Sequence, residues 1–517
     1  MLAKIYTTAF LGLEVFPIEI EVDVSEGLHA FNIVGLPDPA IKEAKQRVSA
    51  ALKNMGAKSP LRSNKKVTIN LAPADLKKFG SYYDLGIALG FLIASQQMPA
   101  FDPEKKIFLG ELTLEGEIRP VKGVLGAAWW AEEHHYEYLF VPQENALEAA
   151  SAAKNLKVIG IKTLRELVKY LEGQINLEPT IALPQEISTS LPEIDFSQIK
   201  GQEKAKRALL IAASGGHNLL MIGPPGSGKT LLAKAFHGLL PPLNTTESLE
   251  VTKIYSLLGL VNPEAPLITQ RPFRAPHHTA SPAALIGGGT YPLPGEITLA
   301  HRGVLFLDEL PEFQTNVLES LRQPLEEGEI CVSRAQSKIT FPAKFIFLAA
   351  MNPCPCGYFG DTLKECLCRP SEIIRYRKKV SGPLLDRIDL IIEVPRLTSD
   401  DLISKKSSLE SLDLKKTVLA AREIQTLRFQ QRNKSQKPIF TNSEMKLKDL
   451  EEYCRLEPKA ENLLKTALDK FGLSARSYHR ILKISRTIAD LDASEIIKYE
   501  EVAEALQYKT EFSWNLT

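Results

Sequence analysis

The sequence predicts a multidomain α/β protein built around a phosphate-binding loop, on three observations. A strand-like run at residues 219–222 leads into a Gly-rich loop, and helix-forming residues 231–235 follow that loop. A second strand-like run, at residues 304–307, ends in an acidic pair. The chain has 517 residues, too many for one hydrophobic core, so roughly three or four domains are expected. The Gly-rich loop comprises Gly223, Pro224, Pro225, Gly226, Ser227, Gly228, Lys229 and Thr230.

The Gly-rich loop has the composition needed to hold a polyphosphate. Its glycines allow backbone N–H groups to turn inward, and the following helix presents the positive end of its dipole to the same charge. Lys229 is expected to reach the β and γ phosphates, and the Thr230 hydroxyl to hold Mg²⁺. Because a strand and a helix flank the loop, a chance match in a Gly-rich turn is the weaker interpretation. The loop therefore predicts ATP and Mg²⁺ as cofactors.

The acidic pair indicates hydrolysis as well as binding. Asp308 and Glu309 follow a short apolar run, and ligands of open α/β sheets bind at the carboxyl ends of the strands. Asp308 is expected to complete the Mg²⁺ shell, and Glu309 to orient or deprotonate the water that attacks the γ-phosphate. Solvated acids at a strand end are the alternative, which the phosphate-binding loop disfavours. The sequence therefore predicts an ATPase.

Composition and charge are those of an ordinary soluble globular chain. Hydrophobic residues make up 44% of it, and 63 Lys and Arg residues against 62 Asp and Glu residues give a net charge of +1. This balance excludes a globally basic surface, so any contacts with nucleic acid must come from local loops. No apolar run is long enough to span a bilayer, and the first residues lack the pattern of a secretory signal. The expected location is the cytoplasm, without a membrane partner.

Four of the six cysteines are clustered in two close pairs. Cys354 and Cys356 form the first pair, and Cys366 and Cys368 form the second. A reducing cytosol disfavours disulfides, so the pairs predict a tetrahedral thiolate site with structural Zn²⁺ as the expected metal. The Cys-x-Cys spacing is tighter than the usual Cys-x-x-Cys, and free buried thiols are the alternative.

The order of patterns along the chain predicts four segments. Residues 1–175 alternate strand-like and helical runs, as in an α+β domain. Residues 176–195 are rich in Pro, Ser, Thr and Glu and indicate a linker. The α/β core is expected over residues 196–395, with a Cys-rich insertion at 352–370. Helical periodicity dominates residues 396–517, which are expected to form a helical lid.

The core resembles the AAA+ superfamily, whose members assemble as rings with active sites at subunit boundaries. A strand-like run at residues 344–350 leads to Asn352, which matches sensor 1, the residue that holds the attacking water and the γ-phosphate in that superfamily. A turn formed by Asn352 before Pro353 is the alternative. Residues 199–203 resemble the box that precedes the first helix, near which adenine contacts are expected.

Two arginines match positions that act on the nucleotide in AAA+ proteins. The segment around Arg387 resembles the one that carries the arginine finger, so Arg387 is expected to enter the site of a neighbouring subunit and stabilise transition-state charge. Local pairing of Arg387 with Asp386 or Asp389 is the alternative. The segment around Arg476 resembles the sensor 2 helix, so Arg476 is expected to report lid closure, although an ordinary helix-surface arginine also fits.

The chain between the phosphate-binding loop and the acidic pair is longer than a minimal motor needs. This insertion and a hairpin-like segment at residues 328–340 resemble the helix-2-insert branch, which includes magnesium chelatase and replicative MCM helicases and lines its pore with such loops. Arg334 and Lys338 are therefore candidates for binding DNA phosphates, with a solvated turn as the alternative. His277 and His278 lack spaced partners, which favours polar loop residues over metal ligands.

The first segment resembles the proteolytic domain of Lon, which has a fold like ribosomal S5 domain 2. Lon proteases need a serine nucleophile and a lysine base within hydrogen-bond reach. Here Asp84 falls at the serine position and Leu125 at the lysine position, so no protease activity is expected. A shifted dyad of Ser81 and Lys122 is the alternative. The segments that carry this resemblance are residues 77–90, 112–123 and 139–145.

A Lon-like domain without a nucleophile, ahead of a magnesium-chelatase-type AAA+ core, is the arrangement of the bacterial ComM/YifB family. The chain resembles this family over essentially its whole length, including residues 35–38, 349–357, 381–387 and 486–491. The resemblance implies a homo-hexameric DNA translocase or helicase that moves branched recombination intermediates during uptake of transforming DNA. Single-stranded or branched DNA and recombination proteins are the implied partners. Alternatives are a chelatase-like remodelling chaperone acting on a protein partner and an ATP-dependent protease.

Overall fold

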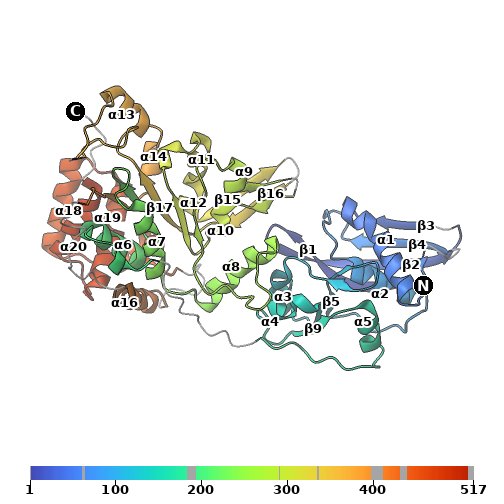
Figure 1. Ribbon diagram of the computed structural model, residues 1–517. Coiled ribbons are helices and arrows are strands. Elements are labelled where there is room, and N and C mark those ends of the chain that lie inside the picture. The colour runs from blue at the N-terminus through green and yellow to red at the C-terminus, as the bar shows by residue number, and fades with distance from the viewer. Residues whose placement is uncertain are drawn as a thin grey trace. The chain divides into compact units, whose positions relative to one another are not determined.

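Contacts within the chain divide it into two compact units. The N-terminal unit comprises Met1–Ser188 and Asn244–Thr269, and the C-terminal unit comprises Thr189–Leu243 and Gln270–Thr517 (Figure 1). The predicted linker, residues 176–195, lies largely outside the described residues, because it is described only up to 182 and from 194. The computed structural model describes residues 2–28, 30–60, 65–182, 194–289, 291–334, 337–361, 363–397, 411–430 and 439–510.

The N-terminal unit is an α+β structure. Its strands are β1 (Leu2–Leu11), β2 (Glu14–Glu26), β3 (Ala30–Val34), β4 (Lys65–Ala72), β5 (Lys106–Phe108), β6 (Glu111–Leu112), β7 (Ile118–Arg119), β8 (Tyr138–Pro142) and β9 (Lys157–Ile161). Its helices are α1 (Pro39–Asn54), α2 (Asp84–Ala94), α3 (Val124–Glu133), α4 (Ala146–Ala150), α5 (Leu164–Leu171) and α8 (Thr245–Leu258), with a 3₁₀ turn η2 (Gln143–Asn145).

A four-stranded sheet in the order β1-β2-β4-β3 carries one core of this unit. β2 pairs antiparallel with both β1 and β4, whereas β3 runs parallel to β4. Ile18, Ile20 and Val22 of β2 are buried at alternate positions, which is the pattern of a strand with one face on a core. β5, β8 and β9 form a separate parallel sheet. The strand and helix runs predicted in this segment are confirmed by β2, β4 and α1.

The motif at residues 35–38 positions the start of α1. Asp38 Oδ1 accepts a hydrogen bond from Ile41 N at 2.8 Å, which caps the helix, and Pro39 occupies its first turn. The second carboxylate oxygen of Asp38 accepts from Gly80 N at 3.2 Å. One side chain therefore fixes both α1 and the loop that precedes α2.

Helix α8 packs within the N-terminal unit, although in the chain it follows the helix of the phosphate-binding loop. Figure 1 shows α8 beside α3, and Gly123 N donates to Ser256 O at 3.0 Å. The Ser256 hydroxyl donates to the buried carboxylate of Glu148, and Leu257 is buried in the core formed around α3 and β8. The sequence placed these residues inside the 196–395 core. The structure groups Asn244–Thr269 with the N-terminal unit because that is where their apolar and polar contacts lie.

The C-terminal unit combines a parallel sheet with many helices. Its strands are β10 (Leu219–Ile222), β11 (Phe273–Arg274), β12 (Gly287–Gly288), β13 (Leu293–Pro294), β14 (Val304–Leu307), β15 (Glu329–Arg334), β16 (Ser337–Pro342), β17 (Ile346–Met351) and β18 (Leu390–Glu393). Its helices include α6 (Glu203–Gly215), α7 (Lys229–Leu239), α9 (Pro282–Ile286), α10 (Glu296–Leu299), α11 (Thr315–Ser320), α12 (Arg322–Glu327), α13 (Pro370–Arg377), α14 (Gly382–Leu385), α16 (Ser411–Gln430), α17 (Leu447–Tyr453), α18 (Pro458–Phe471), α19 (Ala475–Leu491) and α20 (Tyr499–Thr510). Three short 3₁₀ turns complete this unit, η3 (Phe196–Gln198), η4 (Leu310–Glu312) and η5 (Asn442–Glu444). None of the described helices is both long enough and apolar enough to cross a membrane.

The central sheet of the C-terminal unit is parallel throughout, in the order β11-β14-β17-β10-β18. Every residue of β10, β14 and β17 is buried, because helices cover both faces of such a sheet. The strand runs predicted before the phosphate-binding loop, before the acidic pair and before Asn352 are therefore confirmed, as is the helix predicted after the loop. The predicted α/β core is confirmed with them.

The described part of residues 396–517 is helical, as predicted, and a buried ionic cluster joins its helices. The fully buried Arg486 on α19 donates from Nε to Asp490 Oδ1 at 3.0 Å. Arg428 of α16 also contacts Asp490, and Asn442 Nδ2 donates to Asp490 Oδ2 at 2.7 Å. The motif at residues 486–491 is thus an internal element of this helical region. Its action as a lid remains a prediction.

We predict that α8 unfolds together with the N-terminal unit. Ser256→Ala would leave the buried Glu148 carboxylate with one donor fewer, which costs about 1–3 kcal/mol. Hydrogen exchange followed by mass spectrometry should therefore show faster exchange in both α3 and α8, with α7 unchanged. Thr246→Ala, on the exposed surface of the same helix, is the control and should change neither. Faster exchange confined to α7 and the C-terminal unit would contradict this assignment.

Candidate nucleotide-binding site

The predicted site residues follow three neighbouring strands of the parallel sheet. β17 lies between β14 and β10, and the register pairs Leu307 with Ala349 and Ile222 with Met351. Because the strands are parallel and in register, their carboxyl ends meet at one edge of the sheet. That edge receives the phosphate-binding loop after β10, the acidic pair after β14 and Asn352 after β17.

The phosphate-binding loop begins at a tightly packed position. A Cβ atom at Gly223 would lie 2.1 Å from Val394 O, so only glycine fits there. Gln202, which precedes α6, donates from Nε2 to Ser227 O at 3.5 Å. The predicted box at residues 199–203 therefore lies beside the loop.

Lys229 occupies the centre of the loop. Its ammonium group donates to the carbonyl oxygens of Gly223 and Pro224 at 2.7 and 2.9 Å, and to Asn352 Oδ1 at 3.3 Å. Burial lowers the pKa of Lys229 to about 8, and the nearby acidic pair opposes that shift. The loop therefore holds a buried amine, and phosphate oxygens placed beside it would favour its protonated, charged form. Asn352 directly follows β17 and contacts Lys229, and its role as sensor 1 remains a prediction.

The Thr230 hydroxyl and the Asp308 carboxylate lie together at the mouth of the loop. Thr230 Oγ1 donates to Asp308 Oδ2 at 2.6 Å, and Glu309 N donates to the other carboxylate oxygen at 2.9 Å. Thr230 is exposed and Asp308 half-buried, so both oxygens are open to a ligand. Hydroxyl and carboxylate oxygens are the ligands that Mg²⁺ prefers. The pair can hold a Mg²⁺ that arrives with a polyphosphate.

Glu309 has a neighbour that the sequence did not indicate. His278 Nδ1 lies 3.2 Å from Glu309 Oε2, and His278 belongs to the segment that follows the edge strand β11. Because β11 runs parallel to β14, its carboxyl end lies next to the acidic pair. This strand is two residues long, too short to be recognised from sequence. The expectation that His278 is a polar loop residue is compatible with the structure, but its contact with Glu309 was missed.

The two predicted arginines share a single carboxylate. Arg387 contacts Glu326 on α12 through Nη2, and Arg476 Nη2 lies 2.9 Å from the other oxygen of the same group. Glu326 is neither of the two aspartates that the sequence offered as local partners of Arg387. The Arg387 side chain is nearly buried, at 8% exposure for the residue, whereas Arg476 is partly exposed. Sequence could not reveal Glu326, because 61 residues separate it from Arg387.

The four clustered cysteines come together after β17. Their sulfur atoms all lie within 4.8 Å of one another, and Cys354 Sγ lies 3.4 Å from Cys356 Sγ and 3.6 Å from Cys366 Sγ. Thiolates bound to a tetrahedral zinc at about 2.3 Å are separated by about 3.8 Å. The arrangement therefore has the donor set and the size of a tetrahedral metal site.

The predicted DNA-binding hairpin is confirmed as a hairpin. β15 and β16 pair antiparallel, with Ser333 opposite Lys338 and Arg334 opposite Ser337. Lys338 is exposed. The side chain of Arg334 lies outside the described residues, so its contact with DNA remains a prediction, as does that of Lys338.

Asp84, at the position of the Lon nucleophile, is a buried structural acid. Arg47 donates to its carboxylate from Nε at 2.6 Å and from Nη2 at 3.0 Å. Burial raises the pKa of Asp84 to about 6, against the opposing effect of Arg47. Leu125 is buried in α3. The Ser81 hydroxyl donates to Glu111, so it is engaged by a carboxylate.

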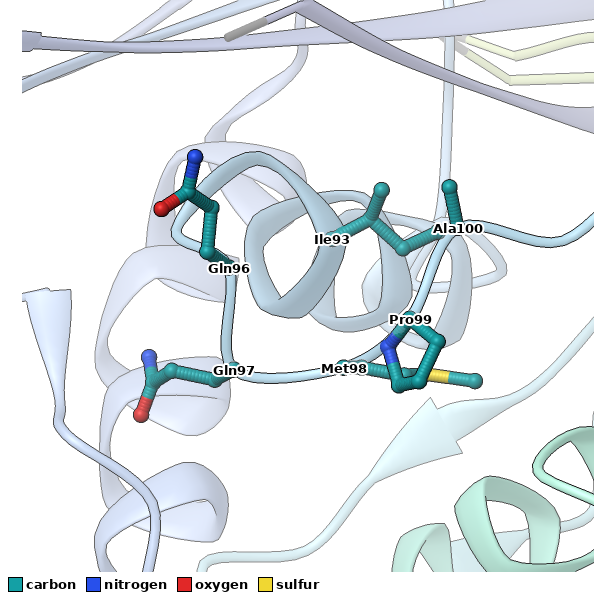
Figure 2. A pocket seen from close by; sticks show the side chains of 6 residues that line it. All are labelled: Ile93, Gln96, Gln97, Met98, Pro99 and Ala100. Atoms are coloured by element: carbon teal, nitrogen blue, oxygen red, sulfur yellow. The ribbon is translucent and has the colours of Figure 1, made fainter.

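A surface pocket lies in the N-terminal unit, far in sequence from the phosphate-binding loop and the acidic pair. Figure 2 shows its lining at the end of α2 and in the loop that follows, formed by Ile93, Gln96, Gln97, Met98, Pro99 and Ala100. The lining has no charged or nucleophilic side chain. The pocket therefore offers no chemistry that the nucleotide site needs.

Three family models match the chain. The model described as magnesium chelatase, subunit ChlI, matches residues 195–402, and the model of its C-terminal part matches residues 408–509. The model described as subunit ChlI of Mg-chelatase matches residues 20–145.

Proteins with similar sequences cover the whole chain. Competence protein ComM of Haemophilus influenzae is 45% identical over 516 residues, which is 98% of this chain and 97% of that protein. YifB of Escherichia coli is 42% identical over 513 residues, with the same coverage. The magnesium-chelatase 38 kDa subunit of Rhodobacter capsulatus is 25% identical over 255 residues, which is 45% of this chain and 69% of that protein. The chain therefore belongs to the ComM/YifB family of magnesium-chelatase-like AAA+ ATPases.

Proposed function

We propose that this protein is a ring-forming ATPase that moves single-stranded or branched DNA in the cytoplasm, as a branch-migration translocase or helicase. The observation that carries the proposal is the meeting of Lys229, Thr230, Asp308 and Asn352 at one sheet edge, with Glu309 beside them. Lys229 supplies a cation that can bind phosphates, and Thr230 and Asp308 supply oxygens that can bind Mg²⁺. Glu309 supplies a carboxylate that can orient a water molecule. Family membership independently implies ATP and Mg²⁺.

The proposed chemistry is in-line attack of water on the γ-phosphate of ATP. Glu309 orients the water and accepts its proton, and Asn352 holds the water and the phosphate. Lys229 and Mg²⁺, bound through Thr230 and Asp308, neutralise the developing charge. His278 Nδ1 contacts Glu309 Oε2, an oxygen of the carboxylate that is proposed to bind the water. His278 must therefore release Glu309 before hydrolysis.

Hydrolysis is proposed to need a second subunit in a homo-hexameric ring. Arg387 would leave Glu326 and place its guanidinium against the γ-phosphate bound by the neighbour, a contact worth on the order of 10³–10⁵ in rate. Arg476 shares Glu326, so its movement onto nucleotide in a closed lid would change the charge around Arg387. The two arginines would then respond to nucleotide together.

Two observations support DNA as the proposed partner. The Haemophilus influenzae relative is named a competence protein, which favours a role in recombination of transforming DNA, where recombination proteins are further proposed partners. The β15–β16 hairpin offers the exposed Lys338 and, at the last residue of β15, Arg334. Cations at a hairpin tip suit binding to phosphates, with an affinity that falls as salt rises.

A chelatase-like remodelling activity on a protein partner is the second candidate. The likeness to the magnesium-chelatase 38 kDa subunit over 255 residues favours it. Such a protein would need a separate protein partner, and not DNA, to stimulate hydrolysis. Protease activity is not proposed, because Asp84 is held by Arg47 and Ser81 by Glu111.

Replacing the proposed base should separate binding from hydrolysis. Glu309→Gln keeps the size of the side chain and loses its basicity, so ATP turnover should fall by about 10²–10⁴-fold. ATP binding and ring assembly, followed by mass photometry, should persist, while movement of a DNA fork junction should stop. Glu312→Gln is the matched control, since Glu312 is a nearby acid that pairs with Lys379 at 3.4 Å, and it should keep turnover. Parent turnover that no DNA structure stimulates at low salt would contradict the DNA proposal.

Two inactive variants should restore each other if Arg387 acts in trans. Arg387→Ala should bind ATP and hydrolyse it about 10³-fold more slowly or worse, whereas Arg375→Ala on the exposed surface of α13 should not. In mixed rings of Arg387→Ala and Glu309→Gln, roughly a quarter of the sites regain both groups, because neighbours meet head to tail. Turnover should therefore reappear on mixing. Mixed rings that stay inactive would show that Arg387 acts only within its own chain.

ATP binding should take up a proton at alkaline pH. With a pKa of about 8, Lys229 is largely neutral at about pH 9 in the free protein, and bound phosphates favour its charged form. Roughly one proton per ATP should bind at about pH 9 and almost none at about pH 6.5, so affinity falls as pH rises through about 8. Calorimetry on Glu309→Gln in buffers of different ionisation enthalpy measures this uptake. Equal uptake at both pH values would refute the role of Lys229.

A further inference from the structure

The cysteine cluster lies directly after the residues that surround the nucleotide. Asn352 follows the last residue of β17, and Cys354 comes two residues later. Residues 354–368, here called the cysteine loop, return on themselves so that all four sulfur atoms lie within 4.8 Å of one another. A metal bound to these sulfurs would close the loop next to Asn352.

The cysteine loop touches the phosphate-binding loop at Gly357. This residue has φ +87°, and a Cβ atom added to it would lie 2.6 and 2.8 Å from Cδ and Cγ of Pro225. The same Cβ atom would lie 3.8 Å from Asn352 Cγ. The backbone of the cysteine loop therefore packs directly against Pro225 and lies close to Asn352.

Other contacts hold the cysteine loop on its far side. Arg377 of α13 donates from Nε to Pro353 O at 3.2 Å, and its guanidinium lies 5.3 Å from the ring centre of Phe359. Asp361 has a buried carboxylate that lies 3.6 Å from Arg396 Nη2. Arg377 and Arg396 thus hold the start and the middle of the loop, whereas the four sulfurs bring its two ends together.

We infer that Zn²⁺ bound by Cys354, Cys356, Cys366 and Cys368 sets the position of Gly357 against Pro225 and Asn352, and so controls nucleotide affinity. The metal replaces the four thiol protons, which pass to solvent, and forms four Zn–S bonds without any change of oxidation state. Without the metal, weak sulfur hydrogen bonds, such as that from Cys356 N to Cys368 Sγ at 3.4 Å, join the two cysteine pairs, and the contact on the phosphate-binding loop is held less firmly. This inference rests on the proposal that the chain binds ATP.

Metal removal tests the inference directly. The full chain should release one Zn²⁺ per protein when its thiols are titrated with a mercurial reagent and the metal is read with a colorimetric chelator. Depleted protein should bind a fluorescent ADP analogue with Mg²⁺ about tenfold more weakly, and Zn²⁺ alone should restore the affinity. The double variant Cys366→Ser/Cys368→Ser should show the same loss without restoration.

Two glycines of the cysteine loop provide a matched pair of variants. Gly357→Ala and Gly360→Ala both place a side chain at positive φ, but a Cβ atom at Gly360 meets nothing within 4 Å. Gly357→Ala should keep its zinc and weaken ADP binding by about tenfold, whereas Gly360→Ala should keep both. Adding Pro225→Ala to Gly357→Ala removes the two atoms that clash and should recover part of the affinity.

The outcomes separate this inference from the proposed function. Less than about half a zinc per chain in protein purified without oxygen, or unchanged ADP affinity after depletion, overturns the inference while the ATPase stands. Equal ADP affinity in Gly357→Ala and Gly360→Ala would show that the contact between Gly357 and Pro225 does not link the zinc site to nucleotide affinity. A parent protein that carries zinc but binds no nucleotide overturns the proposed function instead, and with it the coupling.

Discussion

The nucleotide site depends on the parallel pairing of β14, β17 and β10. Each strand is followed by residues that are needed at the site, and the parallel pairing brings the three carboxyl ends to one edge of the sheet. As a consequence, Lys229 lies within hydrogen-bond distance of Asn352, and Thr230 within hydrogen-bond distance of Asp308. A register shift between any two of these strands would separate the cation from the acids, so backbone hydrogen bonds determine the chemistry here.

Arg387, the candidate arginine finger, is nearly buried within its own chain. Glu326 contacts Arg387 and Arg476 together, so in a single protomer the proposed arginine finger is paired within its own chain. His278 similarly contacts Glu309. These two contacts describe a resting protomer in which both the base and the arginine have competing partners. Assembly and nucleotide binding would then have to displace those partners before turnover.

Local patterns could be predicted from sequence, and distant pairings could not. The phosphate-binding loop, the acidic pair and the four cysteines depend on spacing within a few residues, and the structure brings each set together. Glu326, His278 and the Arg47–Asp84 pair depend on contacts between segments far apart in sequence or on a strand of two residues. The placement of α8 was missed because residues 245–258 do not indicate which core they join, and only the contact with α3 decides it.

The central claim is that hydrolysis requires two protomers. The most direct measurement is ATP turnover per chain across a wide range of protein concentrations, with the fraction of rings determined by mass photometry on the same samples. The account predicts that turnover per chain rises with the ring fraction and falls to background on dilution to monomers. Constant turnover per chain in samples that contain only monomers would contradict it.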